Sequence, residues 1–320
     1  MRTPSMLLAA ALAVASIMPA AAATVAPVSP TSMKSTPMRY NHADIDGIKI
    51  FYREAGDPSK PAILLLHGFP SSSHMHRDLI PLLAKDFHVV APDYPGSGYS
   101  DAPPASKFEP TFANLAKVMS DFTTTVGLKD FVIYMQDFGG PVGFRMAVRH
   151  PERVKGLIIQ NANAYEEGIM PQELAAMKER AAGTLTAEGE KQLDMILSPG
   201  GTEFFYKTGV RDFAAVNPDA YHLDDFVLAK PDNRRIQRAL LVGYFDNVLQ
   251  YPSWHAYMQK HQPRTLILWG KGDPLFLPAG AEAYKRHLPK AELHFFNTGH
   301  FALEEDAPAI AEEIIRFFGH

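Results

Sequence analysis

The sequence predicts an α/β protein: a mostly parallel, doubly wound sheet with a helical cap inserted into it. Three observations support this fold class. The 320 residues are 46% hydrophobic and 21% charged, which suits one large globular domain with an insertion. Short β-rich apolar runs alternate with longer amphipathic runs, as in sheets covered by helices on both faces. Residues 163–254 break this alternation, with helical patterns and no convincing strand.

Strands are predicted where short apolar runs end in turn residues, and helices where apolar residues recur at helical spacing. The expected strands are 48–55, 62–68, 88–94, 131–135, 154–162, 265–270 and 292–297. The expected core helices are 111–126, 141–149 and 308–318. Compact apolar runs such as AILLLHG are typical of strands buried on both faces.

The domain organisation follows from the break in this series. We expect the α/β core at residues 41–162 and 255–320, and a helical cap at 163–254. Cap segments such as PQELAAMKERAA and NRRIQRALLVGYF have helical spacing. The cap is expected over the carboxyl edge of the sheet, where ligands bind in open α/β sheets.

The N-terminus has the pattern of a bacterial secretory signal peptide at residues 1–23. Arg2 is followed by an apolar run at 6–18 and by three alanines at 21–23. The apolar run is too short for a membrane span, and no cysteine at the cleavage site could carry a lipid. We therefore expect an exported protein, periplasmic or secreted, without membrane attachment after cleavage. Residues 24–40, rich in Pro, Ser and Thr, are expected to form a flexible lead-in.

Composition excludes several classes of function. Without cysteine the chain has no disulfide, thiolate nucleophile or Cys-ligated metal, which fits an oxidising compartment. Its formal charge is -4, and no Lys/Arg run suggests a nucleic-acid partner. His67, His74 and His76 have no acidic partner at ligand spacing, so no metal site is expected. The glycines of GSG (96–98) lack the rest of a dinucleotide fingerprint, and no cofactor is expected.

Three ionisable residues stand two or three positions after predicted strands: Asp137, Asp273 and His300. The carboxyl ends of parallel strands share one edge of the sheet, so these side chains are expected to lie together. Each also has a structural interpretation. Asp137 could cap a helix, Asp273 could open an Asp-Pro turn, and His300 could be a packing residue. Their coincidence at strand ends favours a catalytic site.

Six motifs resemble the α/β-hydrolase superfamily, within it the branch of epoxide hydrolases and haloalkane dehalogenases. They are HGFP (67–70), APDYPGSGYSD (91–101), QDFGG (136–140), HPERV (150–154), LWGKGDP (268–274) and TGHFALEE (298–305). The resemblance covers most of the mature chain except the cap. It implies that Asp137 is the nucleophile, Asp273 the acid and His300 the base, in the order of this superfamily. It also implies an oxyanion hole formed by the backbone N–H groups of Phe69 and Phe138.

An aspartate nucleophile points to a particular chemistry. A carboxylate is already ionised at neutral pH and can displace a leaving group from saturated carbon, forming an alkyl ester. His300 would then activate water while Asp273 orients the imidazole. Asn161 and Asn163 occupy the alternative position for the acid, and neither ionises, so Asp273 is preferred. Such a site opens a C–O or a C–halogen bond.

The leaving group separates two alternatives. The dehalogenases that this chain resembles hold halide with side-chain N–H donors. At the corresponding positions this chain has Phe69 and Phe138, whose side chains carry no such donor. Related epoxide hydrolases use cap tyrosines, and GYFDN (243–247) makes Tyr244 the first candidate donor. Further donor candidates are Tyr165 and Tyr206.

Hydrolysis of epoxides to diols is therefore expected, with haloalkane dehalogenation on the same triad as the alternative. A ligand-binding member of the fold without turnover is the alternative from another class. The pocket is expected to be apolar, to include His67 and Trp254 and to take a small hydrophobic substrate. The sequence indicates no oligomeric state.

Overall fold

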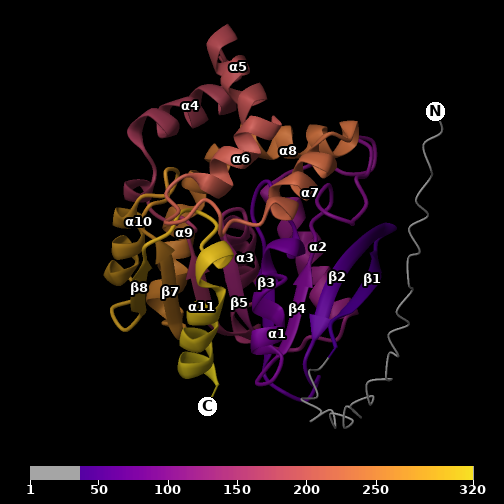
Figure 1. Cartoon of the computed structure of the whole chain (residues 1–320), viewed down its shortest axis with the longest axis vertical. Helices are drawn as coiled ribbons and strands as arrows, with labels where there is room; N and C mark the ends of the chain where they lie inside the picture. Colours follow the sequence, from indigo (N-terminus) through magenta and orange to yellow (C-terminus); the bar gives the residue numbers. More distant parts are fainter. Residues whose placement is uncertain (1–36, 320) are drawn as a thin grey trace, which may run out of the picture. The chain divides into compact units, whose positions relative to one another are not determined.

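The computed structural model describes residues 37–319 (Figure 1). The expected signal peptide and most of the lead-in lie outside the described residues. Within them, eight strands form one sheet in the order β1-β2-β4-β3-β5-β6-β7-β8. The strands are β1 (Arg39–Ile45), β2 (Ile48–Ala55), β3 (Ala62–Leu66), β4 (His88–Pro92), β5 (Phe131–Gln136), β6 (Val154–Gln160), β7 (Thr265–Gly270) and β8 (Glu292–Phe296).

The sheet is mostly parallel, which confirms the predicted fold class. β2 pairs antiparallel with both β1 and β4, and the remaining pairs are parallel. Every residue of β4, β5 and β7 is buried. These strands are covered on both faces, which is why their sequences are apolar runs without alternation.

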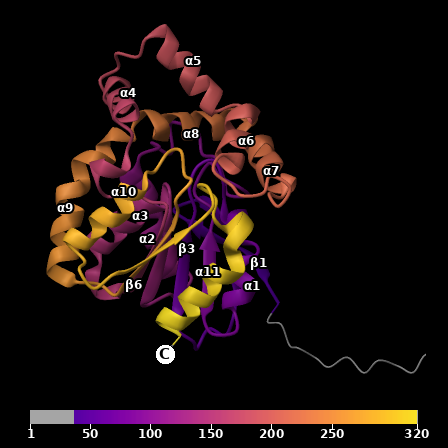
Figure 2. The same cartoon turned by 60° about the vertical axis from the view of Figure 1, so that its left-hand side comes forward.

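Helices cover both faces of the sheet (Figures 1 and 2). α1 (Leu79–Leu83) packs beside α11 (Leu303–Phe318) on one face, whereas α2 (Phe112–Thr125), α3 (Gly139–Arg149) and α9 (Phe245–His261) neighbour one another on the other. α10 (Pro278–Ala283) and the 3-10 turns η1 (Ser73–His76), η2 (Pro151–Arg153), η3 (Glu166–Gly168) and η4 (Tyr284–Arg286) complete the connections. No helix of residues 37–319 is long and apolar enough to cross a bilayer.

Strand β1 was not predicted, and two residues assigned to the lead-in, Arg39 and Tyr40, are its first residues. This strand contains few apolar residues, and most of its positions are exposed or half-buried because it lies at the edge of the sheet. It is held by the turn at Asp46 and Gly47, which have φ values of 53° and 78°. Asp-Gly with two positive φ values is the tight turn that closes antiparallel hairpins.

Two helices begin earlier than predicted. α3 begins at Gly139 rather than at 141. α11 begins at Leu303 rather than at 308, and it bends at Asp306, which has a non-helical φ of −124°. The bend precedes Pro308, whose ring and missing N–H interrupt the helical hydrogen bonds, so the predicted helix is the second of two segments.

The expected cap region holds five helices between β6 and α9 (Figures 1 and 2). They are α4 (Pro171–Ala181), α5 (Ala187–Ile196), α6 (Pro199–Lys207), α7 (Pro218–Leu228) and α8 (Pro231–Val242). Both views show them gathered at one end of the core. α9 leads back to the sheet and runs through the expected boundary at Trp254, ending at His261.

Candidate active site

Asp137 occupies a sharp turn between β5 and α3, with a φ of 49°. A positive φ is strained for a residue other than glycine and is typical of functional sites. The turn tolerates no side chain at two neighbouring glycines. A Cβ on Gly68 would lie 2.3 Å from Cβ of Asp137, and one on Gly139 would lie 2.4 Å from the carbonyl oxygen of Leu66. The N-cap residue of α3 is Phe138, so Asp137 does not occupy the N-cap position considered above.

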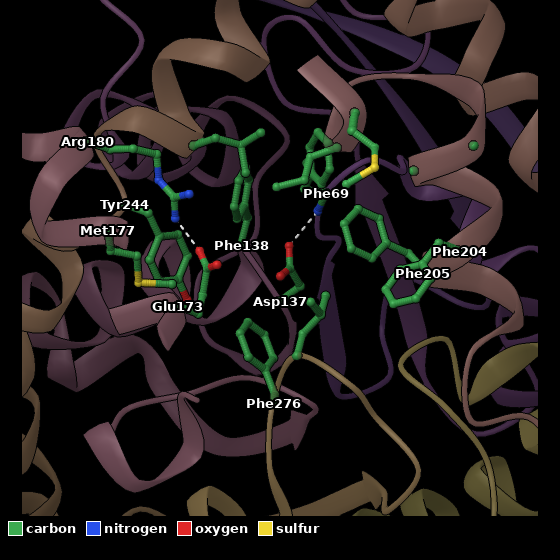
Figure 3. Close-up of a pocket in the computed structure, with 16 residues that line it drawn as sticks. Phe69, Asp137, Phe138, Glu173, Met177, Arg180, Phe204, Phe205, Tyr244 and Phe276 are labelled. Atoms are coloured by element: carbon green, nitrogen blue, oxygen red, sulfur yellow. Dashed lines mark hydrogen bonds and ion pairs between the residues drawn. The ribbon is translucent and has the colours of Figure 1, made fainter. Parts of the chain in front are cut away.

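The two carboxylate oxygens of Asp137 have different neighbours. The backbone N–H of Phe69 donates to Oδ1 at 2.6 Å (Figure 3). Oδ2 lies 3.9 Å from Nε2 of His300. Burial raises the pKa of Asp137, and His300 and the N–H groups of Phe69 and Phe138 offset part of this, leaving the pKa above its ordinary value.

His300 and Asp273 form a tight pair beside this carboxylate. Nδ1–H of His300 donates to Oδ2 of Asp273 at 2.7 Å. The other oxygen of Asp273 accepts from the N–H groups of Leu275 and Phe276, so the aspartate also shapes its own turn. Burial lowers the pKa of His300, but Asp273 and Asp137 outweigh it and hold the pKa above its ordinary value. The structure therefore brings Asp137, His300 and Asp273 together.

Two amide residues at the ends of β5 and β6 support the site and were not expected to do so. Nδ2 of Asn161 donates to Oδ2 of Asp273 at 2.7 Å, and its Oδ1 accepts from Gly270 N–H at 2.9 Å. Nε2 of Gln136 donates to Nε2 of His300 at 2.8 Å. The sequence feature that could have identified both amides is their position at the carboxyl ends of β5 and β6. Residues at the ends of neighbouring parallel strands meet at one edge of the sheet.

A cavity of about 540 Å³ opens beside Asp137 (Figure 3). Its lining combines core residues with residues of the cap and is mostly apolar. The lining residues are Phe69, Asp137, Phe138, Glu173, Met177, Arg180, Met195, Ile196, Gly200, Gly201, Phe204, Phe205, Leu241, Tyr244, Leu275 and Phe276. Among them, Tyr244, Glu173 and Arg180 bring polar side chains in addition to Asp137.

The three candidate tyrosines lie in different places. Tyr244 lines the cavity, and its buried hydroxyl has no hydrogen-bond partner within residues 37–319. Tyr206 does not line it, because its hydroxyl donates to Oδ2 of Asp224 at 2.8 Å and its ring stacks on Phe301. Tyr165 faces a second cavity, where its hydroxyl lies 2.9 Å from Nδ1 of His287. The expectation that Tyr165 or Tyr206 faces the nucleophile is therefore wrong.

Two other expected lining residues also require correction. The Trp254 side chain stacks on Phe144 of α3, because this part of α9 packs on the core instead of the cavity. His67 is held inside its loop, with Nδ1–H donating to the carbonyl of Gly68 and Nε2 accepting from Tyr94 N–H. Burial lowers the pKa of His67 to about 4. Within the described part of the chain, no group of three His, Asp or Glu side chains could hold a metal ion.

Comparisons with known proteins agree with this architecture. A family model described as the alpha/beta hydrolase fold matches residues 61–307. An uncharacterised hydrolase of Saccharomyces cerevisiae is 39% identical over 275 residues, which are 85% of this chain and 94% of the yeast protein. Haloalkane dehalogenase 2 of Mycobacterium tuberculosis is 30% identical over 295 residues, with coverage of 85% and 92%.

Solved structures are similar at the level of the fold. The crystal structure of haloalkane dehalogenase DbeA from Bradyrhizobium elkani matches with a TM-score of 0.72 and 21% identity. The match covers 87% of this chain and 96% of that one. The family match spans most of the sheet and the whole cap, and the relatives are covered nearly end to end. The chain is therefore an enzyme of the α/β-hydrolase family, related to the haloalkane dehalogenases.

Proposed function

We propose that this hydrolase opens epoxides to diols through a covalent ester on Asp137. One observation carries the proposal: Tyr244 lines the cavity that holds the Asp137 carboxylate, and its hydroxyl is buried without a hydrogen-bond partner among residues 37–319. A departing epoxide oxygen requires a hydrogen-bond donor there. Burial raises the pKa of Tyr244 well above its ordinary value, so at neutral pH the phenol keeps its proton and can donate it.

In the first step, Oδ2 of Asp137 attacks an epoxide carbon and the C–O bond breaks. The departing oxygen takes the proton of Tyr244, which leaves a hydroxyalkyl ester on Asp137 and a tyrosinate. Oδ1 becomes the carbonyl oxygen of that ester. The N–H of Phe69, 2.6 Å from Oδ1, already occupies the position that such a carbonyl requires.

In the second step, water replaces the amide of Gln136 as the hydrogen-bond partner of His300 Nε2, gives a proton to this nitrogen and attacks the ester carbonyl carbon. Asp273 stabilises the resulting imidazolium through the 2.7 Å hydrogen bond to Nδ1. The N–H groups of Phe69 and Phe138 hold the negative charge that develops on Oδ1. Collapse releases the diol, which takes the proton from His300, and the regenerated carboxyl group returns its proton to the tyrosinate.

Haloalkane dehalogenation on the same three residues is the second candidate. It is favoured by the 30% identity to a protein named haloalkane dehalogenase 2. Both reactions share the ester and its hydrolysis, and they differ in what receives the leaving group. The side chains at 69 and 138 are phenylalanines, which offer no N–H to a halide. A binding function without turnover, the third alternative, would have no need for the hydrogen-bonded His300–Asp273 pair.

A parallel activity screen tests the proposal. The purified enzyme is offered small apolar epoxides and chloroalkanes or bromoalkanes of matched chain length, with Asp137→Asn as the inactive control. We expect diol formation from the epoxides, abolished in the control. Halide release without diol formation would assign the dehalogenase reaction instead. Neither product, with no ester on Asp137 by mass spectrometry, would favour the binding function.

Export is a further part of the proposal. It is supported by the charged, apolar and small-residue pattern of residues 1–23. Expression of the full chain in a bacterium should give a periplasmic or secreted protein that begins at Thr24. Full-length protein confined to the cytoplasm would contradict export without affecting the chemistry.

A further inference from the structure

The cap contributes one ion pair to the mostly apolar cavity, and the proposed reaction does not use it. Glu173 and Arg180 both belong to α4 and both line the cavity. Nη2 of Arg180 donates to Oε1 of Glu173. Figure 3 shows this pair on the left of the cavity and Asp137 near its centre. The pair is therefore available to a part of the ligand away from the reacting carbon.

The guanidinium of Arg180 is buried and incompletely satisfied. Arg180 is 6% exposed, and its Nε–H has no hydrogen-bond partner within residues 37–319. A buried donor without a partner lowers stability, because it has lost its hydrogen bonds to water and gained none in the protein. Glu173 is the more exposed partner, with 36% of its side chain exposed, and an ion pair that solvent reaches contributes little to stability. A ligand that supplies an acceptor would remove the cost of the unmade hydrogen bond.

The charge of the pair selects the kind of acceptor. Arg180 and Glu173 neutralise each other, so a ligand carboxylate would leave the site with one uncompensated negative charge among apolar side chains. A hydroxyl avoids this cost. Its oxygen can accept from Arg180, and its proton can be donated to Glu173.

Resting on the proposed function, we propose that Arg180 and Glu173 bind a hydroxyl group at the end of the substrate remote from the epoxide. The substrate class is then a hydroxyl-bearing aliphatic epoxide rather than a pure hydrocarbon one. Arg180 and Glu173 act as specificity residues and take no part in bond making or breaking. Phe69, Phe138 and Phe276 provide the apolar surface for the chain between the two ends.

The kinetic test compares terminal epoxides of equal length that end in a hydroxyl or in a methyl group. We expect Arg180→Met to lower kcat/KM for the hydroxyl substrate about tenfold more than for the methyl substrate, a difference equivalent to about 1.4 kcal/mol. Lys178→Met is the matched control, because it removes a cation from the same helix at a residue that does not line the cavity. The double variant Arg180→Met with Glu173→Met leaves no charge unpaired. It should lose the preference for the hydroxyl substrate to the same extent as Arg180→Met alone.

A binding test removes the dependence on turnover. Calorimetry with cyclohexanol and methylcyclohexane, which have similar shapes, measures the same preference with ligands that cannot react. Equal preference for the alcohol in the parent enzyme and in Arg180→Met would overturn this inference, whatever the reaction proves to be. Tighter binding of cyclohexanecarboxylate than of cyclohexanol would overturn the assignment of a neutral group. Absence of epoxide turnover, with the alcohol preference intact, would refute only the proposed reaction.

Discussion

The N–H of Phe69 donates to Oδ1 of Asp137 at 2.6 Å, so this carboxylate is asymmetric before any substrate binds. Oδ2 is the oxygen that lies nearer His300, at 3.9 Å from Nε2. In the proposed reaction, Oδ2 attacks and Oδ1 becomes the carbonyl oxygen of the ester. Because the backbone of the loop after β3 supplies the N–H, the donor is fixed in place and requires no rearrangement during the reaction.

Replacing His300 should separate the two proposed steps. In His300→Gln, Asp137 can still attack, but no base activates water, so the ester persists. Intact-protein mass spectrometry after incubation with a substrate should show one added substrate mass, located on the peptide that contains Asp137. The double variant with Asp137→Asn should remain unmodified. Rapid loss of the ester in His300→Gln would contradict the role of the histidine.

The pH dependence of the two steps should differ. The pKa of His300 is raised above 6.5, and only the neutral imidazole accepts a proton, so ester hydrolysis slows as pH falls through that pKa. Ester formation requires the carboxylate of Asp137, whose pKa is also raised from its ordinary 3.8, so this step depends on a different group. At a pH where His300 is protonated and Asp137 is still ionised, the ester should accumulate. Quench-flow mass spectrometry checks this, and a single shared pKa for both steps would contradict it.

Removing one hydroxyl should distinguish the leaving groups. Tyr244→Phe keeps the ring that packs against Phe112 and Phe138 but deletes the proton donor. We expect kcat for epoxides to fall about 10²–10⁴-fold, the usual contribution of a general acid. Tyr206→Phe is the control, because its hydroxyl is bonded to Asp224 outside the cavity. If Tyr244→Phe leaves the epoxide rate unchanged, Tyr244 is not the donor.

A buried carboxyl group in the cap should make stability depend on pH. Burial raises the pKa of Asp224 to about 8, although hydrogen bonds with Tyr206 and Ser71 oppose the shift. The folded state keeps this proton while the unfolded state releases it near 3.8, so the free energy of unfolding falls as pH rises between these values. Asp224→Asn removes the titration.

The variant should therefore gain Tm relative to the parent as pH increases from about 4 to about 8. Thermal unfolding at several pH values measures the difference. Asp219→Asn, an exposed position on the same helix, is the matched control and should show no such trend. A constant Tm difference for Asp224→Asn would mean that Asp224 does not hold its proton in the folded protein.

Much of the fold could be predicted because the relevant signals are local. The predicted bounds of β2 and β7 agree with the structure, since each is an apolar or alternating run bounded by turn residues. β1 was not predicted, because an edge strand needs few apolar residues and so lacks the pattern of a buried strand. Its pairing depends on the register that the Asp46–Gly47 turn imposes.

The sequence by itself determined that Asp137, Asp273 and His300 follow strands, and parallel strands place such residues at one edge. Only the tertiary structure decided which cap residues meet them. Tyr206 lies in α6 and Tyr244 in the turn before α9, and only the packing shows that Tyr244 lines the cavity whereas Tyr206 is hydrogen-bonded to Asp224. Local periodicity specifies that a helix has an apolar side. Which partner covers that side depends on packing between helices far apart in the chain, so Tyr206, Trp254 and the Arg180–Glu173 pair could be assigned only in three dimensions.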